Sequence, residues 1–385
     1  MKKVLLKVAA ASFVVVAGLA FVACQNNANG PSPSSSSSEE TPPPAERLDE
    51  PVGAENPFRG KNYANGSSST TQYRFKDSDE RIVELWSRGS TDFGLQNEMK
   101  YSYNTEQNTL TLALNKYRTS RITDESIDAD IQQYRNRYES YYLSLTGGSS
   151  TNTDSGSSSS FGYSIETVLY TYGEYRTWAE KRANKMAALN NEYIAKFEAL
   201  LNNSQYADRR AEIEEAVSAL KNDTSFSVEA QMKSAFGNPQ VFKYAVTGAN
   251  LTLTAQWPGK FDQATSNWAA ENVRLYFYPS YGSLYASFSG SSSGNFSINN
   301  CTIANGTISG TYYKYASSTS SSSGIQTREE IPVSLGCTMT GSGNETKLKI
   351  NFTNAHADLK ALVGNVSELE FSYSPSVMNW TEITE

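Results

Sequence analysis

The hydrophobic period of the chain changes twice, and these changes constrain its fold more than any other feature. From about residue 58 apolar side chains alternate with polar ones, as at Leu110, Leu112 and Leu114, which is the pattern of half-buried antiparallel strands. From Thr123 the apolar residues recur at helical spacing, and after about residue 238 the period returns to two. The sequence therefore predicts a mainly β protein, an antiparallel meander that forms a barrel or a sandwich and is interrupted by an α-helical insertion.

The same changes divide the chain into a signal peptide (1–23), a tether (24–56), a first β part (57–121), a helical insertion (122–223) and a second β part (224–385). The tether is rich in serine, proline and asparagine. It is expected to be disordered because it cannot bury enough apolar surface to offset its ordering entropy. The first β part has too few strands to hide both of its sheet edges, so we expect the second β part to pack with it.

Three helices are expected within the insertion. Thr123 can cap the first helix, whose first turns carry several carboxylates that the helix dipole favours. A linker rich in glycine and serine in 147–160 separates the first helix from the second. Three helices in about a hundred residues suggest an antiparallel bundle or hairpin. Their apolar positions run from Ile127 to Leu145, from Val168 to Leu200 and from Ile213 to Leu220.

The start of the chain has the three parts of a bacterial export signal. Three lysines come first, an apolar run from Val8 to Val22 follows, and small residues precede Cys24. The apolar run is shorter than the about 20 residues of a membrane-spanning helix. Residues 21–24 (Phe-Val-Ala-Cys) resemble the lipobox of bacterial lipoproteins, with Phe21 in place of the usual leucine, as in spirochaete-type lipoproteins. The alternative is an ordinary signal peptide followed by a chance cysteine.

The lipobox resemblance implies a lipid anchor and a location in the cell. In that family the chain is cleaved before the cysteine, so Cys24 would carry the lipid. Two or more acyl chains hold a protein stably on a membrane, whereas a single chain is marginal. The resemblance places the protein at a bacterial outer membrane or cell surface, with the periplasmic side as the alternative.

Two stretches of the first β part resemble lipocalin-like domains of bacterial lipoproteins. Residues 56–60 (Asn-Pro-Phe-Arg-Gly) are similar to the first strand of such domains, and residues 101–112 are similar to their recurring hairpin. A degenerate second copy of the hairpin lies in 243–253. The resemblance covers roughly 55–115 and a little beyond 240, and it implies a calycin-like barrel with a ligand cup. The tryptophan of the family's Gly-x-Trp start is replaced, since residues 60–62 read Gly-Lys-Asn.

The net charge excludes one large class of partners. Residues 1–23 contain three lysines and no acid, so the rest of the chain has 30 basic and 40 acidic residues, a net charge of −10. No cluster of lysine and arginine is dense enough to hold a phosphate backbone, and nucleic acid is therefore not expected as a partner. An acidic protein is also repelled by anionic head groups, so contact with the membrane must come from the lipid.

The two remaining cysteines, Cys301 and Cys337, suggest a disulfide in an exported protein. It would close a loop of roughly 35 residues and contribute about 3–4 kcal/mol in the loop-entropy model. The alternative is two free thiols in an anaerobic habitat. Zinc is not expected, because two thiols and the lone histidine, His356, lack the spacing of a zinc site.

Catalytic motifs are missing or out of context. Residues 290–294 have the Gly-x-Ser-x-Gly spacing of a hydrolase elbow, but strand-like spacing follows where a helix is required. The acidic run 124–130 lacks the central glycine of a calcium loop, and no phosphate loop or dinucleotide fingerprint occurs. We expect no catalytic residue, no metal and no cofactor. A carboxylate-pair hydrolase stays as a third function, because its two acids meet only in space.

Aromatic residues are concentrated in two adjoining expected strands between residues 273 and 288. Apolar residues such as Leu275 and Phe277 alternate there with tyrosines, so one face is expected in the core and the other is available for binding. Tyrosine is also a good sheet former, and simple sheet packing is the alternative. The predicted binding face consists of Tyr276, Tyr278, Tyr281 and Tyr285.

These features favour a non-enzymatic lipoprotein that binds a protein or a glycan of a host or of the bacterial envelope. The second hypothesis is a lipocalin-like carrier of a small apolar ligand. A closed barrel with an apolar cavity of at least about 300 Å³ would favour the carrier, whereas a filled core would favour the partner-binding protein.

Overall fold

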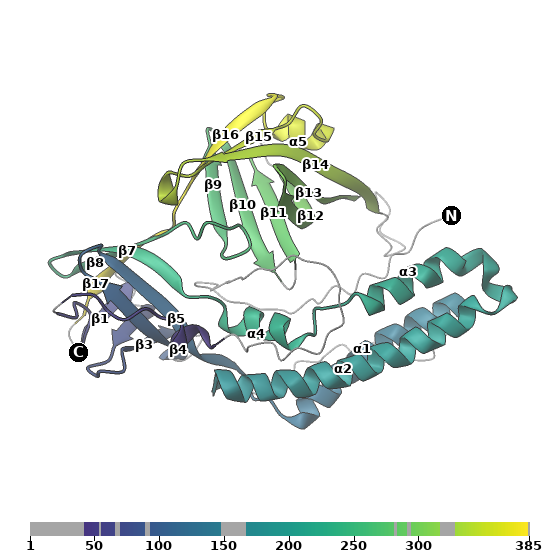
Figure 1. The fold of residues 1–385 in the computed structure, drawn as a ribbon, viewed down its shortest axis with the longest axis horizontal. Coiled ribbons are helices and arrows are strands. Elements are labelled where there is room, and N and C mark those ends of the chain that lie inside the picture. Colours follow the sequence, from purple (N-terminus) through teal and green to yellow (C-terminus); the bar gives the residue numbers. More distant parts are fainter. Residues whose placement is uncertain are drawn as a thin grey trace. The chain divides into compact units, whose positions relative to one another are not determined.

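The computed structural model describes residues 42–53, 55–65, 70–88, 93–147, 167–280, 283–290, 294–315 and 328–383. The predicted signal peptide, Cys24 and the tether as far as residue 41 lie outside these residues. Two compact units are present, one formed by residues 117–232 and the other by residues 42–116 together with 233–383. The first unit is mainly helical. The second unit contains two closed antiparallel barrels of eight strands each, which confirms the predicted mainly β fold with a helical insertion (Figure 1).

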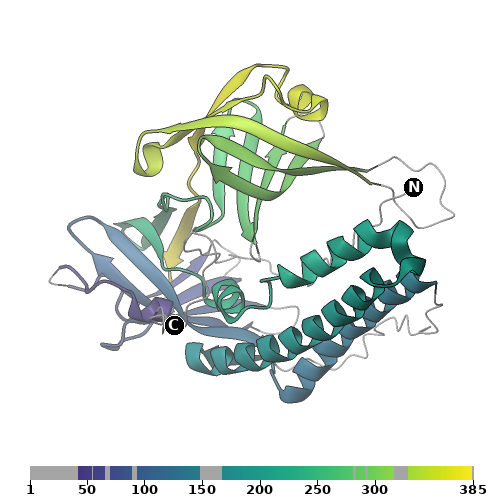
Figure 2. The same ribbon diagram turned by 45° about the vertical axis from the view of Figure 1, so that its right-hand side comes forward.

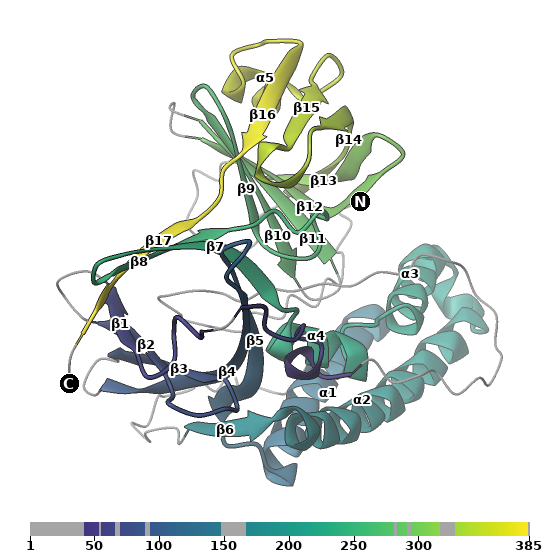
Figure 3. The ribbon, with the colours of Figure 1, turned by 60° about the vertical axis from the view of Figure 1, so that its left-hand side comes forward.

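Barrel A is a simple meander in which each strand pairs with the next one in the barrel and the last strand pairs with the first. Figure 3 shows these strands at the lower left. A ninth strand, β6 (Thr167–Thr171), pairs with β5 outside the ring. The eight barrel strands are β1 (Asn62–Asn65), β2 (Thr71–Phe75), β3 (Ile82–Arg88), β4 (Phe93–Asn104), β5 (Thr109–Ser120), β7 (Gln240–Thr247), β8 (Asn250–Ala255) and β17 (Val377–Glu382).

Barrel B has the same meander topology and uses eight consecutive strands, with β16 pairing back to β9. A short helix, α5 (Ala357–Leu362), and a turn of 3-10 helix, η3 (Gly343–Glu345), lie in its connections. The strands are β9 (Ser266–Ala270), β10 (Val273–Ser280), β11 (Ser283–Ser289), β12 (Asn295–Ala304), β13 (Thr307–Tyr315), β14 (Arg328–Thr340), β15 (Lys347–Asn351) and β16 (Glu368–Tyr373).

Barrel A is therefore interrupted twice. The helical unit lies between β5 and β7 in the chain, and all of barrel B lies between β8 and β17. The sequence pattern placed every strand after residue 240 in one system, but only β7, β8 and β17 of that region join the first five strands. Alternation of apolar and polar residues shows which side chains face inward, and it does not show which strands are partners. The second barrel could not be separated from the first on that basis.

Aromatic side chains fill the interior of both barrels. In barrel B the rings of Phe261 and Phe277 have centroids 4.5 Å apart, and Trp268 is fully buried among them. In barrel A the centroids of Phe58 and Phe75 are 5.1 Å apart. Aromatic pairs at such separations add stabilisation beyond the burial of their area. The two lumens are hydrophobic cores packed with side chains.

Three buried polar atoms inside barrel A have no hydrogen-bond partner among the described residues. The hydroxyls of Tyr63 and Tyr73 and the indole N–H of Trp380 are buried and form no hydrogen bond with the described residues. The rings of Tyr73 and Trp380 are in contact, with centroids 4.5 Å apart. In the helical unit, by contrast, the Tyr138 hydroxyl donates to Asn190 Oδ1 at 3.1 Å, and both residues are buried.

Because of this difference, removing the hydroxyl of Tyr73 and removing that of Tyr138 should affect the free energy of unfolding differently. Tyr73→Phe is expected to change the free energy of unfolding by less than about 0.5 kcal/mol or to raise it, because the hydroxyl has no partner to lose. Tyr138→Phe is expected to lower it by about 1–3 kcal/mol, because Asn190 Oδ1 loses its donor while buried. Urea unfolding of the two variants measures both values. Equal losses in the two variants would contradict the assignment of partners.

The helical unit contains α1 (Asp124–Thr146), α2 (Tyr172–Leu201), α3 (Arg210–Lys221) and the start of α4 (Val228–Phe236), with a 3-10 segment, η2 (Ser204–Arg209), before α3. Thr123 caps α1 as predicted, since its hydroxyl accepts from the Ser126 N–H. The apolar seam is as expected from Met186 to Leu200. Val168, predicted at the start of the second helix, lies instead on the strand β6, and α2 begins at Tyr172. Ile213 and Leu220 of α3 lie in one core with Leu145 and Leu200.

The sequence suggests an antiparallel arrangement, but α1 and α2 run parallel. Four ion pairs join them at a constant separation of 57 residues, and the two helices lie side by side in Figure 2. Short loops favour antiparallel neighbours, whereas 25 residues separate the end of α1 from the start of α2, enough to return along the helix. The next helix, α3, returns along α2 in the opposite direction, as Figure 2 shows. The four ion pairs between α1 and α2 are Asp124–Lys181, Asp128–Lys185, Arg135–Glu192 and Glu139–Lys196.

Removal of the helical unit is expected to leave barrel A folded. The chain would be shortened by joining Lys116 to Lys233 through about eight Gly and Ser residues, each of which spans up to about 3.5 Å. Strands β5 and β7 pair directly, with Leu110 opposite Phe242, so ring closure does not need the helices. Far-UV circular dichroism should show a cooperative melt of β type. Aggregation, or loss of that melt, would mean that the helices supply essential core.

Candidate functional site

Three tyrosines form a ladder on the outer surface of barrel B, which we call the tyrosine face (Tyr276, Tyr278 and Tyr285). Tyr276 and Tyr278 project from β10, and their rings are stacked with centroids 6.0 Å apart and planes at 20°. Tyr285 of β11 lies directly opposite Tyr278, with ring centroids 5.9 Å apart. Tyr278 is the most accessible of the three, with 38% of its surface exposed.

The surroundings of the tyrosine face are polar and include one cation, Arg274, which is exposed two residues before Tyr276 on the same face of β10. Tyr276 is flanked across the strands by Asn267 of β9 and Ser287 of β11. The Tyr285 hydroxyl donates to Ser297 Oγ of β12. Partial burial, together with the neighbouring tyrosines, raises the pKa of Tyr278 above its ordinary value. The Tyr278 phenol is therefore neutral at physiological pH and offers both a donor and an acceptor.

The predicted alternation on β10 agrees with the structure. Val273, Leu275 and Phe277 point into the core of barrel B and are buried, while Tyr276 and Tyr278 point outward. The structure brings three of the four predicted binding tyrosines together. The fourth, Tyr281, lies outside the described residues.

The other predicted pair, Cys301 and Cys337, consists of two free, buried thiols in the structure. Cys301 lies on β12 and Cys337 on β14, and β13 runs between these strands. Strands separated by one neighbour are roughly 9–10 Å apart, while a disulfide needs Cα atoms within about 7 Å. Sequence separation alone could not reveal the intervening strand.

We therefore expect both thiols to be free and unreactive in the folded protein. Burial and, to a smaller extent, the neighbouring Cys337 raise the pKa of Cys301 to about 12, and burial also raises the pKa of Cys337. Little thiolate is then present at pH 8. A maleimide should label neither thiol at pH 8, and both after unfolding without reductant. Labelling only after reduction would show that the predicted disulfide forms.

Barrel A carries a polar pocket of about 550 Å³ on its outer surface, where a segment that we call the strap (residues 44–53) crosses it. The strap begins with a turn of 3-10 helix, η1 (Pro44–Glu46), and ends beside β4. Its Val52 N–H donates to the Tyr103 carbonyl at 2.9 Å, and the Thr105 N–H donates to the Val52 carbonyl at 2.9 Å.

Gly53 lets the end of the strap lie close to the barrel. Its φ is +123°, a region that side chains other than glycine rarely adopt, and an added Cβ would lie 2.0 Å from Thr105 Oγ1. The sequence assigned these residues to the tether. In the structure residues 44–53 of that predicted tether are packed on the barrel, so the prediction that they are disordered is wrong.

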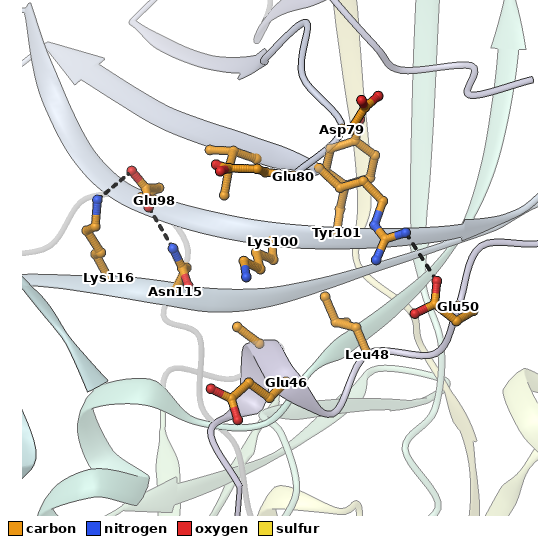
Figure 4. A pocket seen from close by; sticks show the side chains of 13 residues that line it. Glu46, Leu48, Glu50, Asp79, Glu80, Glu98, Lys100, Tyr101, Asn115 and Lys116 are labelled. Carbon is orange, nitrogen blue, oxygen red and sulfur yellow. Dashed lines mark hydrogen bonds and ion pairs between the residues drawn. The ribbon is translucent and has the colours of Figure 1, made fainter. Parts of the chain in front are cut away.

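Charged side chains line the pocket, and most of them are paired. Arg81 Nη1 lies 3.4 Å from Glu50 Oε2 on the strap, and Lys116 Nζ lies 3.0 Å from Glu98 Oε2. Asn115 donates to Glu98 Oε1 at 2.7 Å. Figure 4 shows these contacts, with Lys100 in the middle of the pocket.

Sequence reasoning did not find this pocket. Its lining comes from the strap, the β2–β3 turn, β4 and β5, which share no motif or fixed spacing. The composition of the lining, with acids and bases interspersed, is also that of an ordinary protein surface. Only the fold brings these residues together.

No group of three or more His, Cys, Asp or Glu side chains within the described ranges is placed to hold a metal ion. None of the helices in the described part of the chain is long and apolar enough to span a membrane. Comparison with protein-family models, with curated proteins and with solved structures found no match.

Proposed function

We propose that the protein is a non-enzymatic, lipid-anchored lipoprotein that binds a protein or glycan partner through the tyrosine face. The exposed ladder of stacked tyrosines on barrel B is the observation that carries this proposal. The proposed class is that of the spirochaete-type lipoproteins with a lipocalin-like β domain. Closed eight-stranded meander barrels, the architecture of lipocalins, support it.

The chemistry of the tyrosine face suits recognition. Tyrosine contributes a large, rigid contact area at low entropic cost, and serine and asparagine add adaptable hydrogen bonds. This combination, here Tyr276 and Tyr278 beside Asn267 and Ser287, is typical of binding surfaces. Aromatic rings that expose a face can also stack on the apolar face of a sugar, while hydroxyls and amides bond its polar edge.

The filled barrels favour this function over the carrier. A carrier of an apolar ligand needs an apolar cavity of at least about 300 Å³. The space where such a cup would lie holds buried rings, including Trp268 and Phe288 in barrel B and Tyr73 and Trp380 in barrel A.

The carboxyl groups favour a binding protein over a hydrolase. A glycosidase needs one carboxyl whose pKa is raised so that it can act as an acid. Among the described residues, every carboxyl whose pKa departs clearly from its ordinary value departs downward, because it accepts hydrogen bonds. These groups are Asp124, Glu125, Glu139, Glu192 and Asp358.

The proposed location is a bacterial outer membrane or cell surface, with the periplasmic side as the alternative. The export signal and Cys24 support a lipid anchor, and the tether would hold the barrels away from the membrane. The net charge of −10 beyond residue 23 leaves the lipid as the source of membrane affinity.

A binding comparison of two variants tests the proposal. The chain from residue 25 onward would be applied to a glycan array and, separately, used to capture host and envelope surface proteins. Tyr276→Ser/Tyr278→Ser is expected to weaken the captured interaction by about tenfold or more, because aromatic anchors dominate binding energy. Met339→Ser is the control, since Met339 is 42% exposed on β14, across the barrel from β10. Equal binding by both variants would contradict the proposal.

A further inference from the structure

We propose that the pocket under the strap binds a small molecule that carries a carboxylate and ammonium groups, such as a basic amino acid or a short basic peptide. This site lies on barrel A, and it goes beyond the function proposed for the tyrosine face. It rests on a cavity of suitable size and on three charged groups that face it without a partner among the described residues.

The pocket is large enough for such a ligand. Sites for small molecules have volumes of about 300–1,000 Å³, and this one has about 550 Å³. Its walls belong to one compact unit, because the strap and strands β4 and β5 of barrel A form them. The strap is fastened by Val52 at one end, and the Arg47 side chain donates to Asn238 Oδ1 at 3.4 Å.

The unpaired charges define what the pocket can accept. Lys100, Glu46 and Glu80 form no hydrogen bond or ion pair through their side chains with other described residues, although their neighbours in the lining are paired. Figure 4 shows Lys100 between Glu80 and Glu46. A ligand carboxylate can bind the Lys100 ammonium, and ligand ammonium groups can bind the two carboxylates, in charge-assisted hydrogen bonds. One positive and two negative free groups match a ligand with a net charge of +1.

Other ligand classes fit this pocket less well. Five acids and three bases line it, so phosphorylated compounds and other polyanions are repelled. A metal ion lacks a suitable cluster among the described residues. A neutral sugar would need an exposed aromatic ring for stacking, but Tyr101, the aromatic residue among the described lining groups, is fully buried, and its hydroxyl accepts from Asn56 Nδ2 at 2.8 Å.

The ligand would bridge two parts of the chain. Glu46 belongs to the strap, whereas Lys100 and Glu80 belong to the barrel. A basic dipeptide bound to all three groups would fix the strap against β4. The segment that leads to the predicted lipid anchor would then be held by the ligand as well as by Val52.

Isothermal titration calorimetry with the dipeptide Gly-Lys tests the inference on the chain from residue 25 onward. Gly-Lys supplies one carboxylate and two ammonium groups. We expect it to bind, and we expect Gly-Glu and the N-acetylated, C-amidated form of Gly-Lys to bind about tenfold more weakly or not at all, because each loses charge-assisted contacts. Absence of Gly-Lys binding at 10 mM, or equal affinity for the three probes, would overturn the proposal.

Variants connect the binding to the pocket. Lys100→Met keeps an unbranched side chain and removes the charge, and Glu46→Gln/Glu80→Gln removes both free carboxylates. Each is expected to weaken Gly-Lys binding by about tenfold or more, with an unchanged melting temperature. Lys260→Met, at an exposed lysine outside the pocket, is the matched control. Unchanged affinity in Lys100→Met would refute the site. Tyr276→Ser/Tyr278→Ser should bind Gly-Lys normally, which separates this inference from the proposed function.

Discussion

A chain that ends at Pro375 is expected to lose barrel A and to keep barrel B. The missing strand, β17, pairs with β1 on one side and with β8 on the other, so its loss opens the ring and leaves two unprotected edges. It also removes Trp380, which is only 2% exposed. Loss of a large buried aromatic costs about 3–5 kcal/mol, comparable to the whole stability of a domain of about 5–15 kcal/mol.

Hydrogen exchange followed by mass spectrometry resolves the two barrels in that experiment. Peptides from β2 to β5 should exchange at the rate of an unfolded chain, while peptides from β10 to β16 should stay protected. A chain that ends at Ile383 is the control and should keep both barrels, because all of β17 is present. Protected β2–β5 peptides in the shorter chain would show that barrel A does not depend on β17.

Barrel B is expected to fold when it is made alone as residues 256–375, and barrel A is expected to survive its removal. The two ends of the insertion are neighbours, since the Ala255 N–H donates to the Ser376 carbonyl at 2.9 Å. A short turn can therefore join β8 to β17 without moving either strand. Barrel B has its own core of 25 buried residues, large enough for an independent domain.

Thermal melts of the two separated proteins measure this outcome. Each should unfold in one cooperative transition, and the intact chain should show both transitions. A chain that lacks only residues 283–351 is the control, and it is expected to aggregate because it retains three of the eight strands of barrel B (β9, β10 and β16), with open edges. Failure of the 256–375 fragment to fold would contradict the nested arrangement of the two barrels.

Local periodicity predicted the elements of this fold well, and the partners of those elements poorly. Leu110 and Leu112 face the core of barrel A and Phe277 faces that of barrel B, as alternation requires. The same pattern could not show that β8 is followed in barrel A by β17, more than 120 residues later. The parallel pairing of α1 and α2 could not be predicted for a similar reason. The spacing of apolar residues identifies a helix but does not indicate the direction in which it runs relative to its neighbour.

The sequence predicted site residues only where they lie close together along one strand. Tyr276 and Tyr278 are two residues apart, so their shared face follows from the period of a strand. Lys100, Glu80 and Glu46 lie on three segments and meet only through the fold. Cys301 and Cys337 were paired by elimination, and the strand between them could not be inferred from their positions in the sequence.

Site-specific photo-crosslinking tests the central claim, that the tyrosine face contacts the partner, most directly. A photoreactive phenylalanine analogue would replace Tyr278 in the full-length, anchored protein, and in a second variant it would replace Thr338, which is exposed on β14 on the opposite side of barrel B. After illumination of the cells that carry the protein, position 278 should form a discrete adduct with a protein or a glycan, and position 338 should not. No adduct from position 278, or the same adduct from both positions, would contradict the proposed binding face.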